Sequence, residues 1–113
     1  VELAPSGRSR IGRLLGFRVA STGVYLPEQI VTNADLQRLG CDSDWIVQRT
    51  GMLERRKAAD HEATSDLAYQ AAIDCLKRAN VAAHEVDLII VATITPDHFT
   101  PSTACILQNK LEC

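Results

Sequence analysis

The sequence predicts an α/β protein, and three of its patterns support this fold class. A helical pattern of apolar residues extends over 65–80, and a continuous apolar run of strand length follows at 87–95. A second, weaker strand pattern lies at 16–22. A long helix that leads into a strand of the kind that is buried on both faces is typical of a βαβ unit, in which helices cover both faces of a parallel sheet.

The first part of the chain contains local signals for a strand, a turn and a short helix. β-branched and aromatic residues favour a strand over 16–22, and Gly and Pro predict a turn over 23–28. Asn33, or the threonine before it, is expected to cap a helix over 34–39 that Gly40 ends. A second short helix is expected to follow directly.

That second helix is expected to begin after Asp42 or Ser43, because both are good N-cap residues. Thr50–Gly51 ends it. Trp45 and Arg49 are four residues apart within it, so they are expected to share one face of the helix.

The clearest element is the helix over 65–80, whose apolar residues recur at helical spacing for four turns. Thr64 or Ser65 is expected to cap it. The run at 87–95 is rich in β-branched residues, which predicts a strand buried on both faces. Thr100–Pro101 predicts the start of a last helix, because proline suits the first helical position.

The composition excludes several functional classes. Hydrophobic residues make up 46% and charged residues 23% of the 113 residues, an ordinary globular balance. A net charge of -2 argues against a nucleic-acid-binding arm and a polybasic membrane anchor. The longest apolar run is far shorter than a membrane span.

Two parts of the chain are expected to differ in kind. Residues 1–15 show no periodicity and are interpreted as an N-terminal extension or leader. Residues 16–113 are interpreted as an incomplete N-terminal half-domain, because two strands and one good helix cannot cover a sheet on both faces. We therefore expect the sequence to be the N-terminal part of a larger protein.

The cysteines and histidines lack the spacing of metal ligands, so no metal site is predicted. Reduced thiols in a cytoplasmic protein are the simplest interpretation, and a disulfide framework is the weaker alternative. The cysteines are expected to be packing residues and the histidines surface or structural residues. These residues are Cys41, Cys75, Cys105 and Cys113, and His61, His84 and His98.

An ordered set of short motifs carries the specific signal. The motifs are Ala20–Glu28 (ASTGVYLPE), Val31–Leu36 (VTNADL), Ser43–Gly51 (SDWIVQRTG), Glu54–Arg56 (ERR), Val91–Thr93 (VAT) and Pro101–Cys105 (PSTAC). In this order and spacing they closely resemble the N-terminal region of β-ketoacyl-acyl-carrier-protein synthase III, over about residues 16–113. The resemblance implies the N-terminal part of a thiolase-like αβαβα sandwich that works as a homodimer.

The resemblance also implies an activity for the full-length protein. Members of the family move an acyl group from acyl-coenzyme A to a cysteine and condense it with malonyl-acyl-carrier protein after decarboxylation. The cysteine, histidine and asparagine that do this lie past Cys113 in the family pattern. No catalytic residue is therefore expected in this chain, and the fragment alone is expected to be inactive. Coenzyme A takes part as a substrate carrier, so no resident cofactor is implied.

Binding residues are carried over position by position. The resemblance implies that Trp45 stacks on the adenine of coenzyme A and that Arg49 contacts its phosphates; the alternative is a core tryptophan and a solvated arginine. It also implies that 96–101 is a loop lining the partner's acyl pocket. Thr100 stands where acetyl-using members have phenylalanine, which favours a longer or branched primer, unless Phe99 refills the space or Thr100 only caps the helix.

Two interpretations stay open. The basic run at 55–57 is either a solvated face or an attractant for phosphates and the acidic carrier protein. For function, the alternatives are a related condensing enzyme of secondary metabolism, or a non-catalytic truncated fragment that binds coenzyme A or dimerises.

Overall fold

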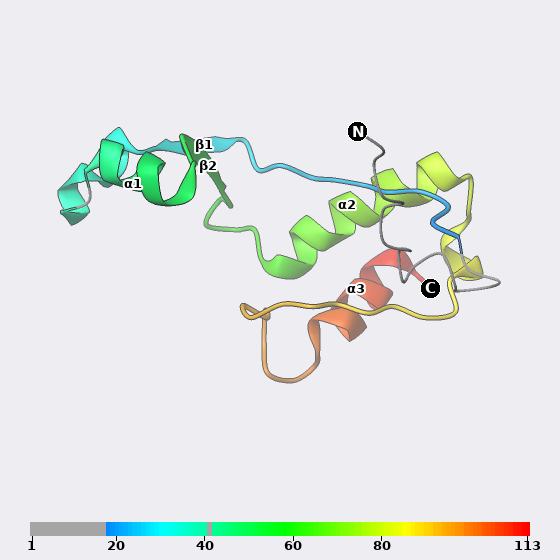
Figure 1. Cartoon of the computed structure of the whole chain (residues 1–113). Helices are drawn as coiled ribbons and strands as arrows, with labels where there is room; N and C mark the ends of the chain where they lie inside the picture. Colours follow the sequence, from blue (N-terminus) through cyan, green and yellow to red (C-terminus); the bar gives the residue numbers. More distant parts are fainter. Residues whose placement is uncertain (1–17, 41) are drawn as a thin grey trace, which may run out of the picture.

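The computed structural model describes residues 18–40 and 42–113, so the expectations for residues 1–17 and for Cys41 lie outside the described residues. Figure 1 shows a long central helix, α2, with α3 beside it and an arm formed by β1, η2, α1 and β2 at one end. The elements are β1 (Gln29–Thr32), η2 (Ala34–Leu39), α1 (Ser43–Thr50), β2 (Glu54–Lys57), α2 (Thr64–Ala79), η3 (Ala83–Glu85) and α3 (Thr103–Leu111).

The two short helices of the arm lie where the sequence predicts them. In α1, the Asp42 carboxylate accepts a hydrogen bond from the Trp45 N–H at 3.1 Å, and Gly51 ends the helix with φ of 71°. In η2, which is a 3₁₀ helix, Gly40 ends the helix with φ of 79°. Asn33 is the N-cap residue of η2, but its side chain makes no cap hydrogen bond, because its amide is engaged elsewhere, as described below. The alternative, Thr32, does accept a first-turn N–H, from Asp35 at 3.4 Å.

The long helix is confirmed, but its predicted cap is wrong. α2 begins at Thr64, so Ala63 is the N-cap residue, and Asp66 accepts the Ala63 N–H at 2.9 Å. Thr64 and Ser65 serve tertiary contacts instead. The Thr64 hydroxyl donates to the Thr95 carbonyl at 2.5 Å, and the Ser65 side chain is 1% exposed beneath α3.

The last helix begins later than Thr100–Pro101. α3 starts at Thr103, because Ser102 has an extended backbone and its hydroxyl accepts the Cys105 N–H at 3.3 Å. Cys105 itself is exposed, so its expected role as a buried packing residue is wrong. It lies on the side of α3 opposite Thr103 and Leu107, which are buried.

The two predicted parallel strands do not form a sheet among the described residues. The segment at 18–26 runs as a strand-like coil alongside α2, and the segment at 86–95 runs as one alongside α3 (Figure 1), but neither has a ladder partner among the described residues. One face of 87–95 is half-covered, whereas Leu88, Ile90 and Ile94 are 74%, 82% and 99% exposed. The expectation of burial on both faces is therefore wrong for this chain, because the helices cover only one face.

The sheet that does form was not predicted. β1 and β2 pair antiparallel, with Gln29 opposite Lys57 and Thr32 opposite Glu54. Neither strand shows a clear alternation of apolar residues, so hydrophobic periodicity could not reveal the pair.

Gly23 has a packing role rather than the turn role that the sequence suggests. A Cβ at this position would collide with the backbone of α2 at Ala71 and Cys75. The close approach is fixed by two hydrogen bonds, from the Ser21 hydroxyl to the Cys75 carbonyl at 3.0 Å and from the Val24 N–H to Asp74 at 3.2 Å. Only glycine lets the segment lie this close to the helix.

The core of the described residues is small. The buried hydrophobic residues are Ile46, Leu107 and Leu111. The radius of gyration is 19.2 Å, whereas a compact domain of this length has roughly 13 Å. Among the described residues, no helix is both long and apolar enough to cross a membrane, and no cluster of side chains could hold a metal ion.

A polar lock holds α2 against α3. The Lys110 ammonium donates to the Ser65 hydroxyl at 2.9 Å and pairs with the Asp66 carboxylate. The hydrogen bond from Lys110, together with the one from the Ala63 N–H, lowers the pKa of Asp66 below its ordinary value. The ion pair between Lys110 and Asp66 therefore stabilises the folded state only while Asp66 is ionised.

Replacement of Asp66 with asparagine is expected to lower the melting temperature of the complete protein near neutral pH. Because folding lowers the pKa of Asp66, its contribution is present above about pH 4 and is lost as the pH falls through the folded pKa. The difference between wild type and Asp66→Asn should thus shrink on acidification, as thermal melts at several pH values would show. Asp60→Asn removes an exposed carboxylate as the control, and a pH-independent difference would contradict the prediction.

Candidate functional site

Trp45 and Arg49 lie on one exposed face of α1. The Trp45 side chain is 53% exposed, and the guanidinium carbon of Arg49 lies 5.7 Å from the centre of the indole ring. Ile46, one residue further along, points inward and is 7% exposed. The helix buries its isoleucine and leaves the indole in solvent, so the alternative of a core tryptophan is wrong for the described chain.

This face offers the two groups that a nucleotide requires. A half-exposed indole presents a flat apolar surface on which a base can stack. The guanidinium beside it is a fork of N–H donors that matches phosphate oxygens, and its contact with the ring orients it. The four-residue spacing places both on one side of the helix.

The structure keeps the predicted acyl-pocket residues apart from α1. Phe99 and Thr100 are both exposed, on the loop between the 86–95 segment and α3, whereas α1 lies at the end of the arm (Figure 1). The loop is anchored by Asp97, which accepts the Ser65 N–H at 2.9 Å and the Thr103 hydroxyl at 3.4 Å. The loop therefore projects from a fixed base.

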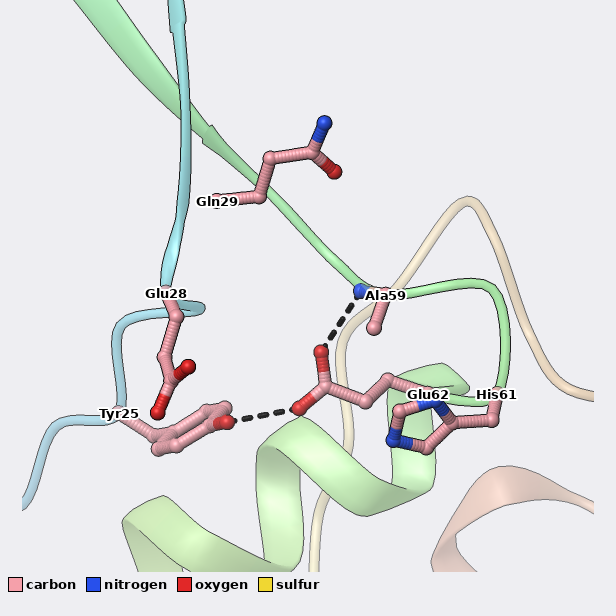
Figure 2. A pocket seen from close by; sticks show the side chains of 6 residues that line it. All are labelled: Tyr25, Glu28, Gln29, Ala59, His61 and Glu62. Atoms are coloured by element: carbon pink, nitrogen blue, oxygen red, sulfur yellow. Dashed lines mark hydrogen bonds between the residues drawn. The ribbon is translucent and has the colours of Figure 1, made fainter.

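A shallow hollow of about 540 Å³ lies between the start of β1 and the turn before α2 (Figure 2). The Tyr25 hydroxyl donates to Glu62 Oε1 at 2.7 Å, and the Ala59 N–H donates to Glu62 Oε2 at 2.8 Å. The first bond lowers the pKa of Glu62 and raises the pKa of Tyr25. His61 also lines the hollow, but neither Trp45 nor Arg49 does. The hydrogen bond between Tyr25 and Glu62 joins two segments that are 37 residues apart in the sequence, so its role is structural.

Two of the three side chains in the basic run at 55–57 donate hydrogen bonds in or beside the arm, and the third is exposed. The Arg55 guanidinium donates from Nη2 to Asn33 Oδ1 at 3.0 Å, and Arg56 donates to the Pro27 carbonyl at 3.1 Å. Lys57 is exposed. Sequence reasoning missed the partnership of Asn33 with Arg55, because it crosses a pair of strands that the sequence pattern does not predict.

The curated relatives match most of this chain but only a part of their own length. No model of a known protein family matches the chain. The β-ketoacyl-[acyl-carrier-protein] synthase III of Rhodopirellula baltica is 65% identical over 101 residues, which are 89% of this chain and 29% of that protein. The protein of the same name from Thiobacillus denitrificans is 58% identical over 95 residues, which are 83% of this chain and 30% of that protein. The chain thus spans less than a third of the length of these relatives.

Solved structures agree with the sequence comparison. The 3-oxoacyl-[acyl-carrier-protein] synthase III of Aquifex aeolicus matches with a TM-score of 0.81 and 45% identity, over 86% of this chain and 32% of that chain. The priming β-ketosynthase of a polyketide biosynthetic pathway matches with a TM-score of 0.79 and 30% identity, over 84% of this chain and 29% of that chain.

Proposed function

Because the chain has the sequence and the thiolase-like α/β fold of part of β-ketoacyl-[acyl-carrier-protein] synthase III, we propose that the complete protein is an acyltransferase of that type. It would condense an acyl-coenzyme A primer with malonyl-acyl-carrier protein, and this chain would supply part of the coenzyme A site. The observation that carries the proposal is the 65% identity over 101 residues.

The reaction itself would be done by residues outside this chain. A cysteine thiolate, activated by a helix N-terminus, would attack the thioester and release coenzyme A. Decarboxylation of the malonyl group would then supply the carbanion that attacks the acyl-cysteine, while hydrogen-bond donors stabilise the negative charge on oxygen. We expect the 113-residue chain alone to be inactive, and we place the complete protein in the cytoplasm as a homodimer.

Trp45 and Arg49 would hold the nucleotide end of the primer. The exposure of the indole and the position of the guanidinium over its ring support this role. Adenine would stack on Trp45, and Arg49 would bind phosphate oxygens. Phe99 and Thr100 would contact the acyl chain bound by the partner subunit, since their loop projects freely among the described residues.

Turnover of a panel of acyl-coenzyme A primers by the complete protein tests the reaction and the primer together. With malonyl-acyl-carrier protein as the second substrate, we expect a β-ketoacyl product and faster turnover of primers longer or more branched than acetyl. Thr100 is smaller than phenylalanine, so the pocket wall should leave more room. Strict preference for acetyl-coenzyme A would refute the primer assignment, and absence of any condensation would refute the reaction.

A related condensing enzyme of secondary metabolism is the second candidate. The match to a priming β-ketosynthase of a polyketide pathway, at 30% identity, supports it less strongly than the closer identities support the first. The two are distinguished by the carrier protein that the enzyme prefers, from fatty-acid or from polyketide synthesis. A non-catalytic truncated fragment is the third, and it predicts coenzyme A binding without turnover.

A further inference from the structure

Asn33 is the most conspicuous buried polar side chain on the arm. It is 4% exposed, and both ends of its amide are used. Nδ2 donates to the Met52 carbonyl at 2.9 Å, and Oδ1 accepts from Arg55 Nη2 at 3.0 Å. We call these two hydrogen bonds the Asn33 bridge. A buried amide satisfied at both ends is costly to disturb, because its partners then lose their own hydrogen bonds.

The Asn33 bridge continues into α1 through the residues that end the helix. The Met52 N–H donates to the Thr50 hydroxyl at 3.1 Å, and that hydroxyl donates to the Ile46 carbonyl at 2.7 Å. Ile46 is next to Trp45, and its carbonyl belongs to the turn of helix that precedes Thr50. A continuous set of short hydrogen bonds therefore joins Asn33 to the turn that carries the indole and the guanidinium.

Besides the burial of Ile46, which is 7% exposed, contacts with η2 and with the turn at Met52 position α1 among the described residues. The helix lies at the end of the arm, away from α2 and α3 (Figure 1), and the element it packs against is η2. The Asn33 side chain holds the turn at Met52, and η2 begins at the next residue along the backbone. Arg55 adds a tie to β2, and its Nη1 is buried without a partner in the described part of the chain.

We infer that Asn33 and Arg55 are positioning residues for the coenzyme A site: they set the direction of the Trp45–Arg49 face without touching the ligand. This inference rests on the proposed function. An aromatic ring and a guanidinium bind a nucleotide together only when their mutual geometry is fixed. Displacement of either group by about 1 Å therefore weakens binding. Loss of the Asn33 bridge should therefore weaken the hold on acyl-coenzyme A and leave the chemical step largely intact.

Steady-state kinetics of the complete enzyme test this with Asn33→Ala, Arg55→Lys and Trp45→Ala. We expect Asn33→Ala to raise the KM for acyl-coenzyme A about tenfold, with kcat and the KM for malonyl-acyl-carrier protein within about twofold of wild type. Arg55→Lys keeps the charge and loses the Nη2 bond, so it should raise the same KM by a smaller factor. Lys57→Ala, which removes an exposed charge from the same strand, is the matched control and should change nothing.

The outcomes separate this inference from the proposed function. If Trp45→Ala raises the KM for acyl-coenzyme A while Asn33→Ala and Arg55→Lys do not, the positioning role is overturned and the coenzyme A site stands. If Trp45→Ala leaves that KM unchanged, the site and the positioning role fail together. A fall in kcat with both KM values unchanged also overturns the inference. Should Asn33→Ala not fold, the milder Arg55→Lys decides the matter.

Discussion

Replacing Trp45 with alanine in the complete protein is expected to raise the dissociation constant for coenzyme A about tenfold to a hundredfold. Stacking of a base on an aromatic side chain contributes roughly 1–3 kcal/mol, and about 1.4 kcal/mol corresponds to a factor of ten. Because the indole is 53% exposed, its removal takes away little internal packing. The loss should therefore appear in binding, measured by titration calorimetry, rather than in the melting temperature.

Arg49→Ala should weaken the same binding by a comparable factor, because hydrogen bonds from a cation to phosphate are stronger than those between neutral groups. The two effects should not add. Arg49 contacts the ring at 5.7 Å, so removal of Trp45 also removes what orients the guanidinium. A double variant is expected to lose less than the product of the two single losses.

The matched control is Arg38→Ala, which removes an exposed arginine from the neighbouring helix η2. If Arg49 binds phosphate through a specific contact, Arg38→Ala should leave the affinity for coenzyme A unchanged. Equal affinities for wild type and Trp45→Ala would remove Trp45 from the site. If Arg38→Ala loses as much affinity as Arg49→Ala, then Arg49 acts through general electrostatic attraction and not through a specific contact with phosphate.

The sequence predicted those parts of the fold that are fixed by local chemistry. Helix α2 follows from the spacing of its apolar residues, and the ends of α1 follow from Asp42 and Gly51, whose roles need only their own backbone. The shared face of Trp45 and Arg49 likewise follows from a spacing of four residues within one helix, whereas the exposure of the indole is known only from the structure. Such features do not depend on what the rest of the chain does.

Features that depend on distant contacts were missed or misplaced. Gly23 looks like a turn residue in the sequence, but its lack of a side chain matters for contact with α2, some 50 residues later. Ser65 looks like a helix cap in the sequence, but its N–H donates to Asp97 and its hydroxyl accepts from Lys110. Asn33 could not be recognised as a bridge, because the strand that brings Arg55 to it has no alternating pattern.

The isolated 113-residue chain is expected to unfold without a cooperative transition, whereas the complete protein should melt sharply. Leu88, Ile90 and Ile94 form a largely exposed row on a segment with no strand partner among the described residues. A strand with this composition is stable only when both its edges and its second face are covered. Scanning calorimetry of both proteins, together with binding of a dye that detects exposed apolar surface, measures the difference.

The variant Ile90→Ala tests whether the isolated chain is unstable because its exposed apolar row lacks packing partners. In the complete protein, burial of Ile90 would make this change cost about 2–5 kcal/mol, because it leaves a cavity in a packed core. In the isolated chain, where Ile90 is 82% exposed, the same change should leave the calorimetric trace and the dye binding almost unchanged. Lys77→Ala, on the exposed last turn of α2, should be nearly neutral in both. A sharp, reversible melt of the isolated chain as a monomer would show instead that these residues cover their own apolar face.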